Sequence, residues 1–141
     1  EPPPESVRVF RRAVRDFRSL LKQKPDDIDA ADAVGFTLAD AKRDLPEAEA
    51  LIAKAHAARP NDPSIADSWG WVQYRLGHLV EAAQTLRAAW QASQMPDIGV
   101  HLGEVLWQQG DHAGAQRVFD AVRKLDPHNV SLQGTVKRLQ P

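Results

Sequence analysis

The chain has 141 residues, of which 43% are hydrophobic, and its formal net charge is −1. These values fit one globular domain of ordinary size and give no electrostatic drive towards nucleic acid. The absence of cysteine excludes a disulfide framework, a thiolate metal site and a catalytic thiol. No apolar run approaches the roughly 20 residues that a membrane-spanning helix needs.

Apolar residues recur at helical spacing along almost the whole chain, so we expect a series of helices. Residues 1–4, EPPP, are expected to form an extended leader, because consecutive prolines do not continue a helix. Asp62 and Pro63 are a helix start signal, since aspartate caps a helix and proline fits its first position. The expected helices are Glu5–Lys24, Ile28–Lys42, Leu45–Arg59, Pro63–Leu76, Leu79–Ser93, Asp97–Gln109, Ala113–Leu125 and Val130–Leu139.

The first expected helix has two chemically different sides. Its apolar stripe consists of Val7, Phe10, Val14, Phe17 and Leu21. Its other side is basic, with Arg8, Arg11, Arg12, Arg15, Arg18 and Lys22. One interpretation is a site for an anionic partner, such as lipid headgroups, nucleic acid or an acidic protein. We favour the other, a solvated face of a packed helix, partly balanced by the acidic residues of segment 26–49.

Three central segments repeat one pattern. Gly35, Gly70 and Gly103 lie at intervals of 35 and 33 residues. Each glycine is followed by a small and then a bulky residue in the next helix: Ala48 and Ile52, Ala82 and Leu86, Ala115 and Phe119. One helical hairpin of this size cannot bury both of its apolar faces, whereas stacked copies form a continuous core. The first helix matches the second helix of such a unit, so we expect it to be half a copy.

A period of about 34 residues, built from paired helices with this pattern of small and large residues, resembles the tetratricopeptide repeat. The third unit, LGEVLWQQGDHAGAQRVFDAVRKLDP, is the best match. The resemblance implies an all-α, right-handed α-solenoid over residues 5–129. Its expected parts are a half repeat at 5–27, repeats at about 28–62, 63–95 and 96–129, and a C-terminal capping helix within 130–141.

A longer run is similar to a narrower group. GFTLAD, EAEALIAKAHAARPNDPSIADSWGWVQYRLGHLVEAAQTLRAAW and HLGEVLWQQGD resemble the C-terminal repeats of proteobacterial outer-membrane lipoproteins of tetratricopeptide type. Some of these serve as periplasmic adaptors, including for a C-terminal processing protease. The resemblance implies a periplasmic location, with attachment to the outer membrane through a lipid anchor outside this chain. The alternative location is the cytoplasm.

The first helix of each pair is expected to line the concave side of the solenoid. Fixed offsets from the three glycines then place aromatic and acidic residues on this surface. The expected aromatic anchors are Phe36, Trp71, Tyr74 and Trp107. The expected charged groups are Asp32, Asp67, Asp97 and Glu104, with Arg75 as the base. Trp71 and Trp107 are also open to a core interpretation, while Trp69 is expected in the core and Trp90 against the next repeat.

These features predict a non-catalytic scaffold, an adaptor that binds a neutral or basic protein or peptide segment in an acidic, aromatic-lined groove. Tetratricopeptide repeats that clamp a C-terminal carboxylate resemble one another in an asparagine two residues before the glycine. This chain has Ala33, Ser68 and His101 at those positions, so a carboxylate clamp is not expected. The histidines are scattered and no phosphate loop or nucleophile motif is present, so we expect no enzyme activity, cofactor or metal.

Two alternatives to the groove remain. The basic first helix would dock on an anionic membrane or nucleic acid, and its binding would weaken steeply with salt. The chain also starts at Glu1 within a repeat, which predicts a fragment or processed form. The N-terminal edge of such a piece would be bare, and self-association through that edge is the second alternative.

Overall fold

The computed structural model describes residues 1–141 and is entirely helical. Every helix expected from the sequence is present, and no end shifts by more than two residues. The helices are α1 (Glu5–Gln23), α2 (Ile28–Asp40), α3 (Leu45–Ala58), α4 (Pro63–Arg75), α5 (Leu79–Ala92), α6 (Pro96–Gln108), α7 (His112–Leu125) and α8 (Val130–Leu139). None of them is long and apolar enough to cross a bilayer.

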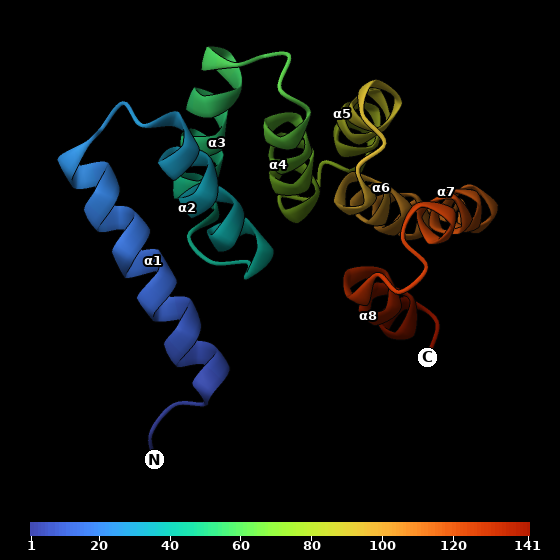
Figure 1. The fold of residues 1–141 in the computed structure, drawn as a ribbon, viewed down its shortest axis with the longest axis horizontal. Coiled ribbons are helices and arrows are strands. Elements are labelled where there is room, and N and C mark those ends of the chain that lie inside the picture. Colours follow the sequence, from blue (N-terminus) through green and yellow to red (C-terminus); the bar gives the residue numbers. More distant parts are fainter.

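The helices stack into an arc (Figure 1). The pairs α2–α3, α4–α5 and α6–α7 pack internally, and each pair also packs on the next through α3–α4 and α5–α6. Helix α1 covers α2 at one end, and α8 covers α6 at the other. Helices α2, α4 and α6 lie on the inner side of the arc, with α3, α5 and α7 outside them (Figure 1). The predicted all-α solenoid is confirmed.

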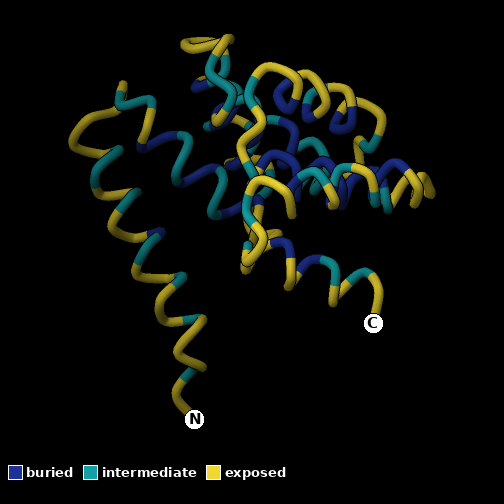
Figure 2. The backbone as a smooth tube through the Cα atoms, turned by 45° about the vertical axis from the view of Figure 1, so that its right-hand side comes forward, coloured by how far each residue is buried: buried dark blue, intermediate teal, exposed yellow.

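The repeated glycines allow the two helices of each pair to cross closely. A methyl group at Gly35, Gly70 or Gly103 would overlap with Ile52, Leu86 or Phe119, respectively, in the second helix of the same pair. These three bulky side chains are fully buried, as are the small residues Ala48, Ala82 and Ala115. Buried residues therefore gather where helices face one another, while the outer faces are exposed (Figure 2).

The turns inside the pairs are of two kinds. Gly77 and Gly110 adopt φ values of 88° and 89°, a region that glycine enters without steric cost. The turn of the first pair lacks glycine and is longer, and it places Lys42 and Asp44 at φ values of 55° and 47°. At the next helix start, the Asp62 carboxylate accepts hydrogen bonds from the backbone N–H groups of Ser64 and Ile65, which confirms the predicted cap.

Helix α1 is the least integrated helix. Only Val14 is buried along its length, and in Figure 2 its N-terminal half extends away from the other helices. Arg18 pairs with Glu47 at 2.7 Å and Asp44 at 3.4 Å, so the acidic residues after α1 do balance part of its charge, as expected.

Candidate functional site

A hollow of about 340 Å³ opens on the inner side of the arc. Helices α2, α4 and α6 build most of it, and Phe17 of α1 and Met95 before α6 complete it. Three residues at one repeat position meet there: Ala33, Ser68 and His101, each two positions before a repeat glycine. The walls thus come from equivalent surfaces of successive repeats. This hollow is called the inner hollow below.

Four of the nine residues expected in the groove line the inner hollow: Asp32, Phe36, Asp67 and Asp97. Phe36 and Asp32 are half-buried, Asp97 is exposed, and Asp67 is buried. No lysine or arginine is among the lining residues. The hollow therefore combines apolar walls with acidic groups, as the repeat pattern predicts.

Asp32 is the carboxylate with the most unusual surroundings. Its Oδ1 atom is buried and has no hydrogen-bond partner. Burial raises the pKa of Asp32 above its ordinary value; the nearby Ser68 hydroxyl partly offsets this, and the negative charges of Asp62, Asp67 and Asp29 add to the rise. The charges that act most strongly on Asp32 are thus of its own sign.

His101 is a member of the site that the sequence analysis did not include. Its Nδ1 atom lies 2.8 Å from Oδ1 of Asp67, and its ring stacks on Trp71 with centroids 4.3 Å apart. Burial lowers the pKa of His101, but the bond to Asp67 and the charges of Asp67 and Asp97 more than offset this, so the net shift is upward. His101 therefore pairs with Asp67, whereas Asp32 and Asp97 form no ion pair.

Trp71 is not an exposed anchor, which corrects the expectation for this residue. It is 2% exposed, its Nε1 donates a hydrogen bond of 3.2 Å to Asp40, and its ring centroid lies 4.9 Å from that of Tyr74. The Arg75 guanidinium covers the same indole ring at 4.7 Å and donates to the Asp40 carbonyl oxygen. Groups from neighbouring repeats close over the ring, so Trp71 supports the inner face from below.

Glu104 is likewise buried, at 2% exposure, and does not offer a free carboxylate to a partner. It accepts a hydrogen bond of 2.7 Å from the Tyr74 hydroxyl and an ion pair from Arg138 of α8. Burial, followed by the bond to Glu104, raises the pKa of Tyr74. These bonds, together with His101–Asp67, Trp71–Asp40 and Arg75–Asp40, join residues 30 to 35 positions apart. Pairs of polar residues one repeat apart are thus the sequence signal for this network.

The remaining tryptophans divide between the surface and the core. Trp107 is half-buried and stacks on His112 at 3.7 Å, outside the inner hollow. Trp90 is buried and lies close to Gly99 of the next repeat, as expected. Trp69 is half-buried and packs against the edge of the core, so the expected core placement holds in part. It lies on the side of α4 away from the inner hollow.

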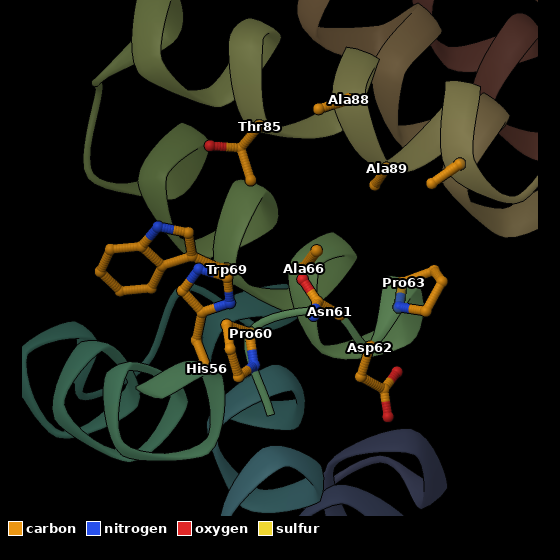
Figure 3. Close-up of a pocket in the computed structure, with 11 residues that line it drawn as sticks. His56, Pro60, Asn61, Asp62, Pro63, Ala66, Trp69, Thr85, Ala88 and Ala89 are labelled. Atoms are coloured by element: carbon orange, nitrogen blue, oxygen red, sulfur yellow. The ribbon is translucent and has the colours of Figure 1, made fainter. Parts of the chain in front are cut away.

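Trp69 belongs to a second hollow of about 440 Å³ on the outside of α4 (Figure 3). Its ring stacks on His56 at 5.8 Å, and alanines of α5 form the opposite wall, as Figure 3 shows for Ala88 and Ala89. The one carboxylate in its lining, Asp62, is engaged in capping α4. Uncompensated charge is therefore a property of the inner hollow.

The arc of stacked helix pairs, with a lined inner face, defines the chain as an α-solenoid repeat protein. The family model of the tetratricopeptide repeat matches residues 72–139. TPR repeat-containing protein PA4667 of Pseudomonas aeruginosa is 43% identical over 90 residues, which cover 64% of this chain and 15% of that protein. Together with the fold, the family-model match identifies tetratricopeptide repeats within residues 72–139. The match to PA4667 spans only a small part, 15%, of that relative's length.

Solved structures share the fold at low sequence identity. The tetratricopeptide protein TTC0263 of Thermus thermophilus superposes with a TM-score of 0.77 at 17% identity, covering 95% of this chain and 74% of that one. MamA of Desulfovibrio magneticus superposes with a TM-score of 0.69 at 22% identity, covering 89% of this chain and 71% of that one. PilF of Pseudomonas aeruginosa superposes with a TM-score of 0.71 at 20% identity, covering 94% of this chain and 63% of that one.

Proposed function

We propose that the inner face holds an extended segment of a protein partner, neutral or basic in charge, and that the protein acts as a non-catalytic adaptor in a larger assembly. The tetratricopeptide fold supports a role as a scaffold for protein–protein interaction. The observation that carries the finer proposal is the inner hollow, where apolar walls meet two carboxylates, Asp32 and Asp97, that form no ion pair. Acidic surfaces of this kind select partners by charge and speed their association.

The supporting network has a part in this proposal. Trp71, Arg75, Tyr74 and Glu104 use their polar atoms within the chain, so they hold neighbouring repeats at a fixed spacing. A preformed surface loses less entropy on binding than one that must be ordered. The contacts to the partner are then assigned to Asp32, Phe36 and Asp97, which line the inner hollow.

Site-specific photo-cross-linking tests the proposal in cells that express the full-length gene. We would place p-benzoylphenylalanine at Ser64, which is exposed at the inner hollow, and in matched variants at Gln84 and Arg12, which are exposed on α5 and α1. Mass spectrometry would identify the cross-linked peptides. The proposal expects one partner segment to cross-link at Ser64 and not at Gln84. Cross-links at Gln84 or Arg12 with none at Ser64 would refute it.

A second candidate is docking of α1 on an anionic membrane. Arg8, Arg11 and Arg12 form no ion pair. A cleft of about 300 Å³ beside α1 is lined by Arg11, Arg15, Arg18 and Arg43 together with Phe10. Binding to vesicles that contain anionic lipid, lost on replacing Arg8, Arg11 and Arg12 by glutamine and at high salt, would support this candidate. The periplasmic location stays a prediction, which cell fractionation would check.

A further inference from the structure

We propose that the inner hollow is a pocket for one basic side chain, lysine or arginine, of the bound segment. This inference rests on the proposed function and specifies what the inner face recognises. The groups that carry it are Asp32, Asp97 and Phe36, with Phe17 on the α1 side. Three independent properties of the hollow lead to it: its unbalanced charge, an unpaired buried oxygen, and its apolar walls.

The charge of the hollow is not balanced within the chain. Asp67 is answered by His101, and Asp29 nearby is paired with Arg59 at 2.7 Å. Asp32 and Asp97 form no ion pair. The charged groups with the largest effect on the pKa of Asp32 are Asp62, Asp67 and Asp29, all negative. A single positive group from outside would relieve this repulsion, whereas an anionic side chain would increase it.

Asp32 also carries a carboxylate oxygen that no group of the chain satisfies. Its buried Oδ1 accepts no hydrogen bond, and an unsatisfied buried acceptor is costly because it has lost water without a replacement. Lysine carries three N–H donors and arginine five, and both form charge-assisted hydrogen bonds with carboxylates. A neutral apolar side chain would fill the volume and leave the oxygen unpaired.

The walls fit a cation on a long apolar stem better than a bare metal ion. No set of three His, Asp or Glu side chains in the chain is placed to hold a metal. Phe36 and Phe17 are half-buried, and the buried Ile98 also lines the hollow. Methylene groups of lysine or arginine pack on such surfaces, and a cation near an aromatic face gains further attraction.

Peptide selection on the intact chain tests the pocket. A phage-displayed library of random short peptides would be panned on the immobilised protein, and the strongest binder would be synthesised with a fluorophore. Anisotropy titrations would compare the native protein with Asp32→Asn and Asp97→Asn. Asp120→Asn is the matched control, because it removes the same charge from an exposed site on α7. Ser64→Arg would place a cation at the hollow and block it.

The expected result is a selected peptide with one lysine or arginine that all tight binders share. Replacing that residue by norleucine should weaken binding about tenfold or more, as loss of a charged hydrogen bond does. Asp32→Asn or Asp97→Asn should have a similar effect, with little further loss when combined with the norleucine peptide. Asp120→Asn should bind as the native protein does.

The failures of the two proposals are distinguishable. Peptides that lose affinity with Ser64→Arg, yet contain no shared basic residue and ignore Asp32→Asn and Asp97→Asn, would overturn the pocket and leave the inner-face function standing. Peptides that bind equally well to Ser64→Arg, or a selection that enriches none, would overturn both. Because Asp97 is exposed, its variant tests the pocket even if Asp32→Asn were to disturb the fold.

Discussion

The Tyr74 hydroxyl on α4 donates a hydrogen bond of 2.7 Å to Glu104 on α6, a residue that is 2% exposed. Arg138 of α8 pairs with the same carboxylate. A buried carboxylate is tolerated only when such partners satisfy it. Glu104 therefore joins the second repeat, the third repeat and the last helix through one side chain.

Tyr74→Phe should lower the free energy of unfolding by about 1.5–3 kcal/mol, because the ionised Glu104 loses a hydrogen bond and cannot return to water. Phenylalanine keeps the ring that packs on Trp71, so the loss reports on the hydroxyl. Urea unfolding followed by tryptophan fluorescence would measure it. A change below about 0.5 kcal/mol, which is typical of surface substitutions, would mean that this hydrogen bond does not support the buried carboxylate.

Gly70→Ala should destabilise the chain by about 1–3 kcal/mol. The added methyl group would overlap with the Leu86 side chain, so α4 and α5 would have to move apart. The cost of this overlap exceeds the gain of roughly 1 kcal/mol that alanine brings to a helix interior, so the net effect is destabilising. Gly134→Ala is the matched control: it adds a methyl group in α8 where nothing lies within 4 Å, and it should stabilise. Equal effects of both variants on thermal unfolding would contradict the close-crossing role of Gly70.

Local patterns were sufficient to predict the helices and the paired packing. The partners of Gly70 and Gly103, which are Leu86 and Phe119, follow from a repeat that any sequence alignment of the chain with itself reveals. Helix caps such as Asp62 depend on residues two or three positions away, so they are also legible in the sequence.

Side-chain exposure on the inner face was not predictable in the same way. The face of a helix follows from its period, but whether Trp71 is open depends on Asp40, Arg75 and His101 from three different repeats. A pattern taken one repeat position at a time does not show which polar residues meet across repeats. Comparing polar residues one repeat apart, such as Asp67 with His101, would have indicated pairs that close the surface. Trp69 packs on the core but stays partly exposed in the hollow between α3, α4 and α5, which a repeat pattern does not show.

The stability of the chain should fall as pH rises through the pKa of His101. This pKa is higher in the folded than in the unfolded state, so the folded chain binds the proton more tightly. The stabilising contribution is complete below about pH 6.5, the ordinary value for histidine, and is lost above the raised pKa. The charged groups that raise the pKa of His101 are Asp67, Asp97 and Asp40, all negative.

Thermal unfolding at about pH 6 and about pH 8 would check this dependence. Asp67→Asn removes the hydrogen-bonding charge, and it should reduce the difference between the two pH values. Asp120→Asn, far from the ring on α7, should leave the difference unchanged. A native protein that is more stable at the higher pH would show that burial, which lowers this pKa, outweighs Asp67.

Asp32→Asn should make the free chain more stable at neutral pH. The pKa of Asp32 is raised in the folded state, so folding disfavours its ionised form, and stability declines as pH rises from the ordinary aspartate value through the raised one. Asparagine keeps the shape without the charge and removes this cost. The expected outcome is a higher unfolding temperature than the native chain at about pH 7, with a smaller gain at about pH 4, where more of the native carboxyl is protonated.

The same substitution is expected to weaken peptide binding, and the two effects together identify the role of the residue. Replacing a side chain that serves only the fold lowers the stability of the protein. Replacing one that is kept for a ligand raises the stability and lowers the affinity for the ligand. Asp29→Asn is the comparison variant, because Asp29 is paired with Arg59 on the surface and should change either property little. If Asp32→Asn unfolds at a lower temperature than the native chain at neutral pH, the carboxylate is stabilising after all, and the interpretation of its surroundings as unfavourable is wrong.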